Sequence, residues 1–464
     1  MNALASAVPA REQTFDWPLC YEAEEVVLRH LAAFVERNEF ARTLSHRMRE
    51  ETGTLLLDWV DHIVVSGEHE ADFRAAGFED DAAVEAESGM VSLHHPRAML
   101  PRVRVDAGAS SLSTPRLLAV RPEFVADFIA AHNLRAEPEG EPLSRFRRVF
   151  VSEAHGCRLE AVERRGYRGY TPASLPPGAV AARLKARELF HTRPREFADD
   201  AEGFRITHVL TKRAVALVGR ALAANFFWEA ERARWERRNR AAQIQKRRQD
   251  ALGLGWGNHD HHTPRCSRRN FLAVMRLMEL LGFERRERYH AGHDAGWGAQ
   301  ILEHPVEPIV VFADVDLLPE ERELDFSRVP LPEVRQLGTV GLWTGLHGDS
   351  LLDAGMHHLE ARFDHALLRE QLGKEGVATM NPFSDFEFLR QAFTEGERWP
   401  VRPERAARLL AAGSITREQH DEFVGHGAIG SHLENLQRRG GFKGFNQRSV
   451  SAIIAATDPR KQSN

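Results

Sequence analysis

The chain contains little cysteine and no long apolar segment. Its 464 residues include three cysteines, Cys20, Cys157 and Cys266, which are far apart in the sequence. An odd number of scattered cysteines argues against a disulfide framework and is typical of the reducing cytoplasm. No run of about 18 apolar residues is present, and the first residues lack the basic and apolar stretches of a signal peptide. We therefore expect a cytoplasmic protein without a membrane span.

The chain also lacks a strong excess of charge of either sign. Its formal net charge is −5, with 42% hydrophobic and 28% charged residues. This balance is typical of a soluble globular protein, and it provides no overall attraction to nucleic acid or to an anionic membrane. The length is sufficient for two or more domains.

Histidine, by contrast, is abundant and clustered. The chain has 23 histidines, and the segment NHDHHTPR (residues 258–265) places three of them around an aspartate. Because neutral imidazole is a common metal ligand, this segment is the first candidate for a metal site.

The order of predicted helices and strands divides the chain into five regions. They are an N-terminal helical region (1–57), a first mixed module (58–178), a helical insert (179–256), a second module with an extension (257–400), and C-terminal helices with a tail (401–464). In both modules a strand is followed by a short helix that ends at glycine and then by further strands. This is the order of a βαβββ module, and paired modules of this type curl a mixed sheet around a pocket. The predicted fold class is therefore α+β, with a metal site inside the curled sheet.

Paired βαβββ modules supply metal ligands from three places: the first strand of one module, the first strand of the next, and the last strand of that next module. Reading the chain in this way selects His62 in DHIVVSG, His261 in DHHTPR and Glu303 in QILEHP. Two imidazoles and one carboxylate form the usual non-haem Fe(II) site, which leaves positions open for substrate and oxygen. Glu303 lies between apolar residues, where a buried carboxylate is costly unless it binds a metal or pairs with a neighbouring arginine.

The alternation of side chains along a strand sorts the residues next to these candidates. His259 and His261 should share one face, and His262 should point away, so His259 and His262 are expected to support the site rather than to bind metal. Asp260 should lie on the opposite face from His261 and reach it only through a bulge. Asp61 should likewise point off the face of His62, which makes it a weak candidate for holding that imidazole.

These segments resemble motifs of the 2-oxoadipate dioxygenase/decarboxylase family, non-haem iron enzymes related to the vicinal-oxygen-chelate superfamily. HHTPR is similar to the family's His-x-Thr-Pro-Arg, AQILEHPVEPIVVFAD to its strand with the ligand glutamate, and DHIVV to the strand with its first ligand histidine. The order of features extends over most of the chain, whereas identity outside the motifs is low. The resemblance implies an Fe(II) cofactor with His62, His261 and Glu303 as its ligands.

The resemblance also implies a reaction. Enzymes of this family use O₂ to decarboxylate a 2-oxo acid and hydroxylate its chain, which gives a hydroxy acid and CO₂. The family's carboxylate-binding arginine, four residues after the first ligand, is replaced here by Ser66, which is a substrate-binding candidate by its position. Arg265 is the best remaining candidate for binding the substrate carboxylate, and Arg97 is the second. The expected partners are a 2-oxoadipate-like small molecule and O₂, without nucleic acid or membrane.

A glyoxalase-like lyase or isomerase that uses Zn(II) or Ni(II) as a Lewis acid is the main alternative. Such sites usually have a fourth protein ligand, and the sequence offers several candidates for it, namely His259, His357, His358 and Glu360.

Two further segments have a functional and a simpler interpretation. The basic stretch 232–248 has the composition of a phosphate-binding helix, but a solvated helix face is the simpler explanation, so nucleic-acid binding is disfavoured. The segment GFKGFNQ (441–447) has the composition of a substrate loop or a cover over the pocket, and a plain terminal loop is favoured.

Overall fold

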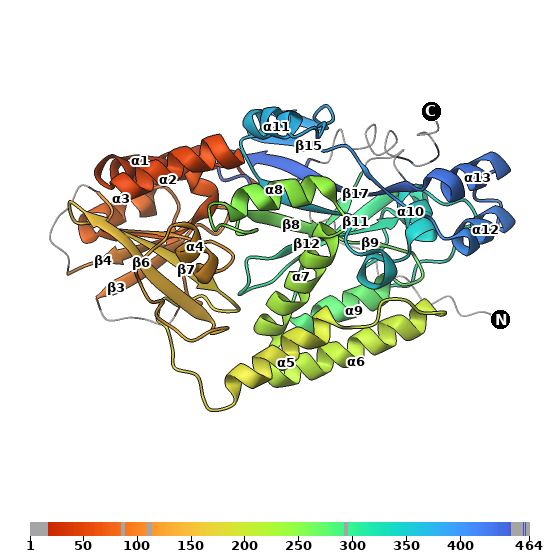
Figure 1. Cartoon of the computed structure of the whole chain (residues 1–464), viewed down its shortest axis with the longest axis horizontal. Helices are drawn as coiled ribbons and strands as arrows, with labels where there is room; N and C mark the ends of the chain where they lie inside the picture. Colours follow the sequence, from red (N-terminus) through yellow and green to blue (C-terminus); the bar gives the residue numbers. More distant parts are fainter. Residues whose placement is uncertain are drawn as a thin grey trace.

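The computed structural model describes residues 17–84, 89–108, 114–291, 296–446, 458 and 460. Two curled mixed sheets lie side by side, the first from the N-terminal half of the chain and the second from the C-terminal half (Figure 1). The first sheet has the strand order β2-β3-β4-β1-β5-β7-β6. Its strands are β1 (Val60–Ser66), β2 (Glu79–Asp80), β3 (Met90–His94), β4 (Arg102–Asp106), β5 (Leu117–Val120), β6 (Phe146–Ala154) and β7 (Cys157–Arg164).

The second sheet has the order β10-β11-β12-β8-β13-β17-β15-β14, with β9 paired to β12 and β16 paired to β17. Its strands are β8 (His259–Thr263), β9 (Arg265–Cys266), β10 (Glu284–His290), β11 (Trp297–Glu303), β12 (Val310–Asp316), β13 (His358–Arg362), β14 (Ser384–Phe386), β15 (Leu389–Phe393), β16 (Glu397–Trp399) and β17 (Ala428–Arg438).

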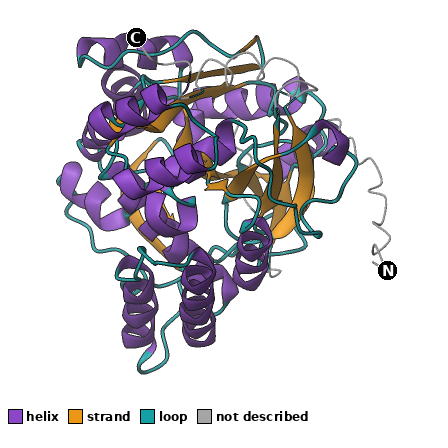
Figure 2. Ribbon diagram, turned by 90° about the vertical axis from the view of Figure 1, so that its right-hand side faces the viewer, coloured by secondary structure: helices purple, strands orange, loops and turns teal. Residues whose placement is uncertain are grey.

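Helices pack around both sheets (Figure 2). They are α1 (Tyr21–Arg37), α2 (Glu39–Arg47), α3 (Glu70–Ala75), α4 (Val125–Ala131), α5 (Ala179–His191), α6 (Asp200–Val218), α7 (Arg220–Glu236), α8 (Arg240–Asp250), α9 (Phe271–Leu281), α10 (Thr339–His347), α11 (His365–Lys374), α12 (Pro403–Ala411) and α13 (Arg417–His426). Within the described part of the chain, none of them is both long and apolar enough to cross a bilayer.

Each sheet is assembled from two strand-helix-strands units. In the second sheet, β8-α9-β10-β11-β12 is one unit, and β13-α11-β14-β15 followed by β17 is the next. In the first sheet, β1-α3-β2-β3-β4 is followed by β5-α4-β6-β7. The first strands of the two units pair antiparallel in both sheets, β1 with β5 and β8 with β13. The predicted fold class of paired βαβββ modules is confirmed, and the chain holds four such units, two in each half.

One face of each sheet is apolar and covered by helices. Residues of α1 and α2 form a core with β1, β4, β5 and β7, and residues of α5 to α9 form a larger core with β12, β13 and β17. Leu359 and Leu433 of the second sheet are fully buried in that larger core. Because side chains alternate along a strand, their neighbours Glu360 and Glu434 point to the opposite face, where the sheet curls around a cavity.

Strand β17 lies in the region 401–464, where the sequence predicts only helices and a tail. The strand pattern is weak there, because GSHLENLQ carries polar residues on one face and no β-branched residue. The polar face is nevertheless buried, including His432 and Glu434. The sequence of β17 is polar because one face of the strand, which carries Glu434, lines a polar cavity.

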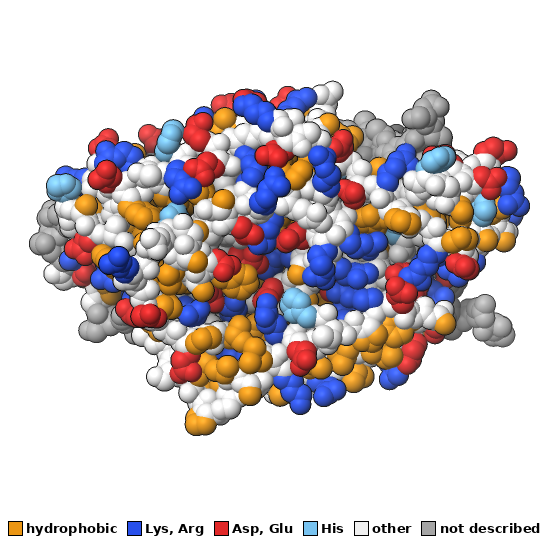
Figure 3. All heavy atoms as spheres, in the orientation of Figure 1, with side chains coloured by type: hydrophobic (Ala, Val, Ile, Leu, Met, Phe, Trp, Pro, Cys, Tyr) orange, Lys and Arg blue, Asp and Glu red, His pale blue; other side chains and the backbone are white. Residues whose placement is uncertain are grey.

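Side chains of the basic stretch 232–248 are largely used in contacts within the protein. Arg232 pairs with Glu123 at 3.3 Å, Arg234 donates to the carbonyl of Asp353, and Arg248 donates to the carbonyl of Glu51 at 2.9 Å. Figure 3 shows basic and acidic side chains interspersed over one face of the molecule.

Candidate metal centre

A group of possible metal ligands lies on three neighbouring strands of the second sheet. Glu360 on β13 pairs in register with His261 on β8 and with Glu434 on β17. The three side chains therefore stand in a row on one face of the sheet, and one ligand atom from each lies within 4.8 Å of the others. All three are buried. Among the described residues, this is the group with the geometry to hold a metal ion.

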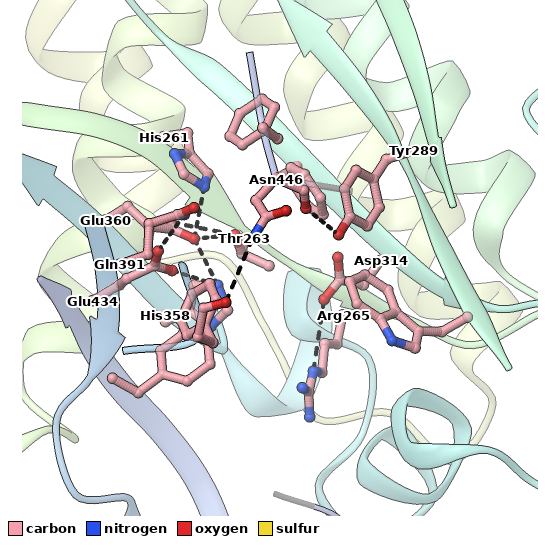
Figure 4. Close-up of a pocket in the computed structure, with 15 residues that line it drawn as sticks. His261, Thr263, Arg265, Tyr289, Asp314, His358, Glu360, Gln391, Glu434 and Asn446 are labelled. Carbon is pink, nitrogen blue, oxygen red and sulfur yellow. Dashed lines mark hydrogen bonds and ion pairs between the residues drawn. The ribbon is translucent and has the colours of Figure 1, made fainter. Parts of the chain in front are cut away.

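The side chains of this group are in direct contact (Figure 4). Nε2 of His261 lies 2.7 Å from Oε1 of Glu360. Nε2 of His358, two positions before Glu360 on the same strand face, lies 2.7 Å from the same oxygen and 3.8 Å from Oε2 of Glu434. His358 is thus a fourth donor within reach of the group.

Burial favours the protonated forms of the two carboxyl groups. Burial, together with the charge of Glu434, raises the pKa of Glu360 well above its usual range. Burial also raises the pKa of Glu434 to about 7. Burial lowers the pKa of His261 to about 4, so its imidazole is neutral and able to bind a metal. The donor set fits a divalent cation, since a cation would take the place of the protons on two adjacent acids.

Asp260 fixes the orientation of the ligand imidazole. Its Oδ1 lies 2.9 Å from Nδ1 of His261, and Arg438 donates to both of its carboxylate oxygens at 3.0 Å. A proton on Nδ1 is held by this carboxylate, which leaves the lone pair of Nε2 directed at Glu360. The sequence excluded Asp260 unless the strand contained a bulge, and the pairing of β8 with β13 shifts register between His259 and His261.

The carboxylates are oriented by two further donors. Oγ1 of Thr263 donates to Glu360 at 3.0 Å, and Nε2 of Gln391 donates to Oε1 of Glu434 at 2.7 Å. Both donors are neutral, so they position the acids without neutralising their charge.

The structure does not bring the three ligands predicted from the sequence together. His261 belongs to the group, but His62 lies on β1 in the other sheet, with its ring 4.6 Å from that of Tyr170. Glu303 is at the end of β11, where its carboxylate pairs with Lys443 at 3.0 Å and is partly exposed. The candidate ligand group in the structure is therefore His261, Glu360 and Glu434, in place of His62, His261 and Glu303. The alternative role considered for Glu303, an ion pair, is the one observed.

The supporting histidines also lie elsewhere. His259 contacts the carbonyls of Trp256 and Pro308, and Nε2 of His262 lies 3.3 Å from Arg232 on the helical side of the sheet. Neither residue contacts the group, because the bulge in β8 turns His259 out of line with His261.

Of the three substrate-binding candidates, one lies at the cavity beside the metal ligands. Arg265 lines it, whereas Arg97 is exposed on a loop after β3 and Ser66 ends β1 in the first sheet. Nε of Arg265 is 3.8 Å from Oδ2 of Asp314, beyond hydrogen-bond distance. Burial raises the pKa of Asp314 to about 8, so this acid is mostly protonated at neutral pH, while Asp316 and Asp458 also act on the charge of Arg265.

The cavity is small and mostly aromatic. Its volume is about 50 Å³, and its walls include the ligand group, Arg265 and six aromatic side chains, namely Tyr289, Trp297, Phe312, Phe383, Phe393 and Phe445. Phe445 and Asn446 belong to the segment GFKGFNQ, for which a plain terminal loop was favoured; its described part instead closes one side of the cavity, where the hydroxyl of Tyr289 donates to the carbonyl of Asn446 at 2.8 Å.

The first sheet repeats part of this arrangement. Asp61 contacts Nδ1 of His62 at 2.7 Å, and Arg164 donates to both oxygens of Asp61 at 2.7 and 2.9 Å, as Arg438 does to Asp260. The expectation that Asp61 points away from His62 is wrong, because β1 also shifts register between Val60 and His62.

The two acidic ligands are not both repeated. In the first sheet His62 pairs with Ala119, and Ala119 pairs with Glu160. Ala119 thus occupies the position of Glu360, and Glu160 that of Glu434. Glu160 contacts Arg158 at 2.8 Å. The first half therefore has an imidazole oriented by an aspartate, His62 with Asp61, but it has Ala119 where the second half has the central carboxylate.

Solved structures with this fold are similar to the chain only at low identity. A 4-hydroxymandelate synthase variant from Streptomyces coelicolor is 16% identical, with 87% of this chain and 98% of that chain covered and a TM-score of 0.29. Methylmalonyl-CoA epimerase from Mycobacterium tuberculosis is 12% identical, with 39% and 88% covered and a TM-score of 0.23. No protein-family model and no curated protein match the chain. At these scores the comparisons carry no argument about activity, and the fold class follows from the strand order.

Replacing Glu360 by alanine should abolish tight binding of a divalent metal, because this carboxylate is the central member of the group. We expect affinity to fall by more than about 100-fold, since even outer partners of ligands contribute about 10- to 100-fold. Metal content after dialysis and a metal titration measure the change. The matched control is Glu303→Ala, which should bind metal as the unmodified protein does. Loss of metal from Glu303→Ala with retention in Glu360→Ala would show that the ligand set above is incorrect.

Replacing Asp260 by asparagine should lower metal affinity about 10- to 100-fold, because the amide can hold the wrong tautomer of His261. Asp61→Asn makes the same change in the repeated arrangement of the first sheet and should leave metal affinity unchanged. Equal effects of the two variants in the same titration would contradict the assignment of the site to the second sheet.

Metal binding should release protons from the two acids. Glu434, with a pKa of about 7, and Glu360, whose pKa is higher than usual, are protonated at low pH and must ionise before they bind a cation. Apparent affinity should therefore rise by about ten-fold or more per pH unit below pH 7 and flatten once both groups are ionised. Calorimetric titrations between pH 5.5 and about 8.5 in buffers of different ionisation enthalpy count the protons released. A pH-independent affinity would argue against both carboxyls as ligands.

Proposed function

We propose that the chain is an Fe(II)-dependent dioxygenase that oxidatively decarboxylates and hydroxylates a 2-oxo acid to a hydroxy acid and CO₂. The observation that carries this proposal is the buried group His261, Glu360 and Glu434, which faces the same cavity as the guanidinium group of Arg265. In the overall reaction, one oxygen atom of O₂ enters the new carboxylate, the other enters the hydroxyl group, and the original carboxylate leaves as CO₂. Bound iron supplies the activation of oxygen and the orientation of the 2-oxo acid.

The chain's own residues prepare the site for such a substrate. Asp260 holds His261 in one orientation, while Thr263 and Gln391 hold the two carboxylates. The aromatic walls exclude water, which strengthens electrostatic interactions inside the cavity. Arg265 provides a planar fork of donors that matches a carboxylate.

The lining favours a 2-oxo acid with an apolar chain over a dicarboxylate such as 2-oxoadipate. Among the described residues that line the cavity, Arg265 is the one arginine, and lysine is absent. A dicarboxylate needs a charged or hydrogen-bonding partner at each end. Because the cavity volume is about 50 Å³, substrate entry requires side chains such as Phe445 to move.

A second candidate function is a lyase or isomerase in which Zn(II) or Ni(II) acts as a Lewis acid. The observation that favours it is the fourth donor, His358, within 2.7 Å of Glu360. A site with four protein ligands leaves fewer open positions for substrate and oxygen than one with three. Glu360 and His358 are both among the fourth-ligand candidates named from the sequence.

Oxygen uptake separates the two functions. The protein is loaded anaerobically with Fe(II) and then exposed to air-saturated buffer with 2-oxo acids that carry apolar, aromatic or carboxylate chains. We expect equimolar consumption of O₂ and release of CO₂ with at least one of them, and none with Glu360→Ala. Arg265→Gln should raise KM about 10-fold or more, because a charge-assisted hydrogen bond contributes about 1.5 to 3 kcal/mol. Arg205→Gln, a surface change of equal charge, is the control. No O₂ uptake with any 2-oxo acid, combined with turnover of the Zn(II) or Ni(II) form on a glyoxalase-type substrate, would favour the second function.

A further inference from the structure

A large cleft separates the two halves of the molecule and is distinct from the cavity at the metal ligands. Its volume is about 720 Å³, and both halves contribute to its walls. Eight arginine or lysine side chains line it, against five carboxyl groups. The size is that of a small-molecule site.

Two of these arginines occupy equivalent positions in the two halves. Arg121 follows Ala119 by two positions, and Arg362 follows Glu360 by two, where Ala119 and Glu360 are themselves equivalent. Each arginine crosses to the other half: Nη2 of Arg121 donates to the carbonyl of Gly257 at 3.1 Å, and Nη2 of Arg362 donates to the carbonyl of Asp58 at 2.9 Å.

The acceptors are equivalent as well. Gly257 precedes His261 by four positions, and Asp58 precedes His62 by four. The two hydrogen bonds are therefore equivalent and are related by the local two-fold symmetry of the halves. The arginine pair lies where the halves meet, with one guanidinium from each.

Among the described residues, neither guanidinium forms an ion pair with a carboxylate within 4.0 Å. A guanidinium has five N–H donors, and the contacts above use one of them in each arginine. Nε of Arg362 is buried without a hydrogen-bond partner. Burial lowers the pKa of Arg121 to about 10, which leaves it charged at neutral pH.

Carboxyl groups near the cleft act on these charges without forming an ion pair with either arginine: Asp61 and Glu307 act on Arg121, and Asp58 on Arg362. Asp61 is bound by Arg164, Asp260 by Arg438, and Glu303 by Lys443. Burial raises the pKa of Glu307 to about 7, so this group carries only part of a charge. Glu284, the fifth, is exposed to solvent at the start of β10. The two guanidinium groups repel each other, and an anion from solution held between them lowers that cost.

We propose that this cleft binds a small polyanion, with one phosphate or carboxylate group held by Arg121 and another by Arg362. The planar donor fork of arginine matches both kinds of group, and two forks facing one cleft suit a molecule with two anionic groups. The ligand bridges the halves, because each of its groups is held by a different half. This inference does not depend on the reaction proposed for the metal centre.

The probes are pyrophosphate and tricarballylate, titrated calorimetrically into the full chain without added metal at 50 and 200 mM NaCl. We expect saturable binding of at least one of them, weaker at the higher salt concentration because the contacts are ionic. Arg121→Gln/Arg362→Gln should weaken binding at least 10-fold. Arg121→Lys/Arg362→Lys, which keeps both charges, should bind more tightly than the glutamine variant. The preferred probe identifies phosphate or carboxylate as the natural chemistry.

Two controls keep the outcome specific to the cleft. Arg42→Gln/Arg417→Gln removes the same charge from exposed helix positions and should bind as the unmodified protein does. Glu360→Ala disrupts the metal centre and should also leave binding unchanged, so failure of the proposed reaction and failure of this site are distinguishable. Circular dichroism verifies that each variant is folded. If the glutamine variant does not fold, the lysine variant is compared with the unmodified protein in its place. Absence of saturable binding at 50 mM NaCl, equal binding by the glutamine variant, or loss of binding in Glu360→Ala would overturn the proposal.

Discussion

Two carboxyl groups buried side by side, those of Glu360 and Glu434, constrain the rest of the second sheet. Removing an ion from water costs several kcal/mol even after the protein relaxes, and placing two like charges together adds to this cost. The protein offsets this cost with polar side chains from three strands: Thr263 and His261 on β8, His358 on β13 and Gln391 on β15. Such an arrangement is stable either with protons on the acids or with a cation between them.

The repeated architecture explains why this site exists once. Both halves pair the first strands of two units antiparallel, and both use an aspartate and an arginine to hold a histidine. In the first half the central position is Ala119, and Tyr170 lies against the imidazole. A single missing carboxylate is enough to convert a candidate metal site into a packed polar core. The first half then serves the second as a structural partner and provides one wall of the cleft between them.

The sequence was sufficient for the fold class and for one member of the ligand group. The rule that ligands come from the first strand of one unit, the first strand of the next and the last strand of that next one describes His261, Glu360 and Glu434 correctly. It was applied with two units where the chain has four, so it selected His62 and Glu303. The unit count was hidden because β17 has a polar face and falls after two helices, at a distance that local periodicity does not bridge.

Asp61 and Asp260 were misjudged for a different reason. Strict alternation places each of them on the face opposite to the adjacent histidine, and a bulge in each strand reverses this. No signal in a single sequence marks such a bulge. The recurrence of Asp-His in DHIVV and HDHHT, followed in each half by an arginine at the end of the last sheet strand, is the signal that could have paired each aspartate with its histidine.

The position of β17 in the sheet has a consequence for how the protein is made. This strand follows the other strands of the second sheet in the chain, yet it lies between β13 and β15 and supplies both Glu434 and Arg438. A ribosome releases the chain from its N-terminal end, and domains fold as units once their segments are available. During synthesis, β13 and β15 emerge before the strand that lies between them. A nascent chain that has emerged only as far as β16 therefore contains His261 and Glu360 but not Glu434. The group of three candidate ligands is therefore complete only once β17 has paired with β13.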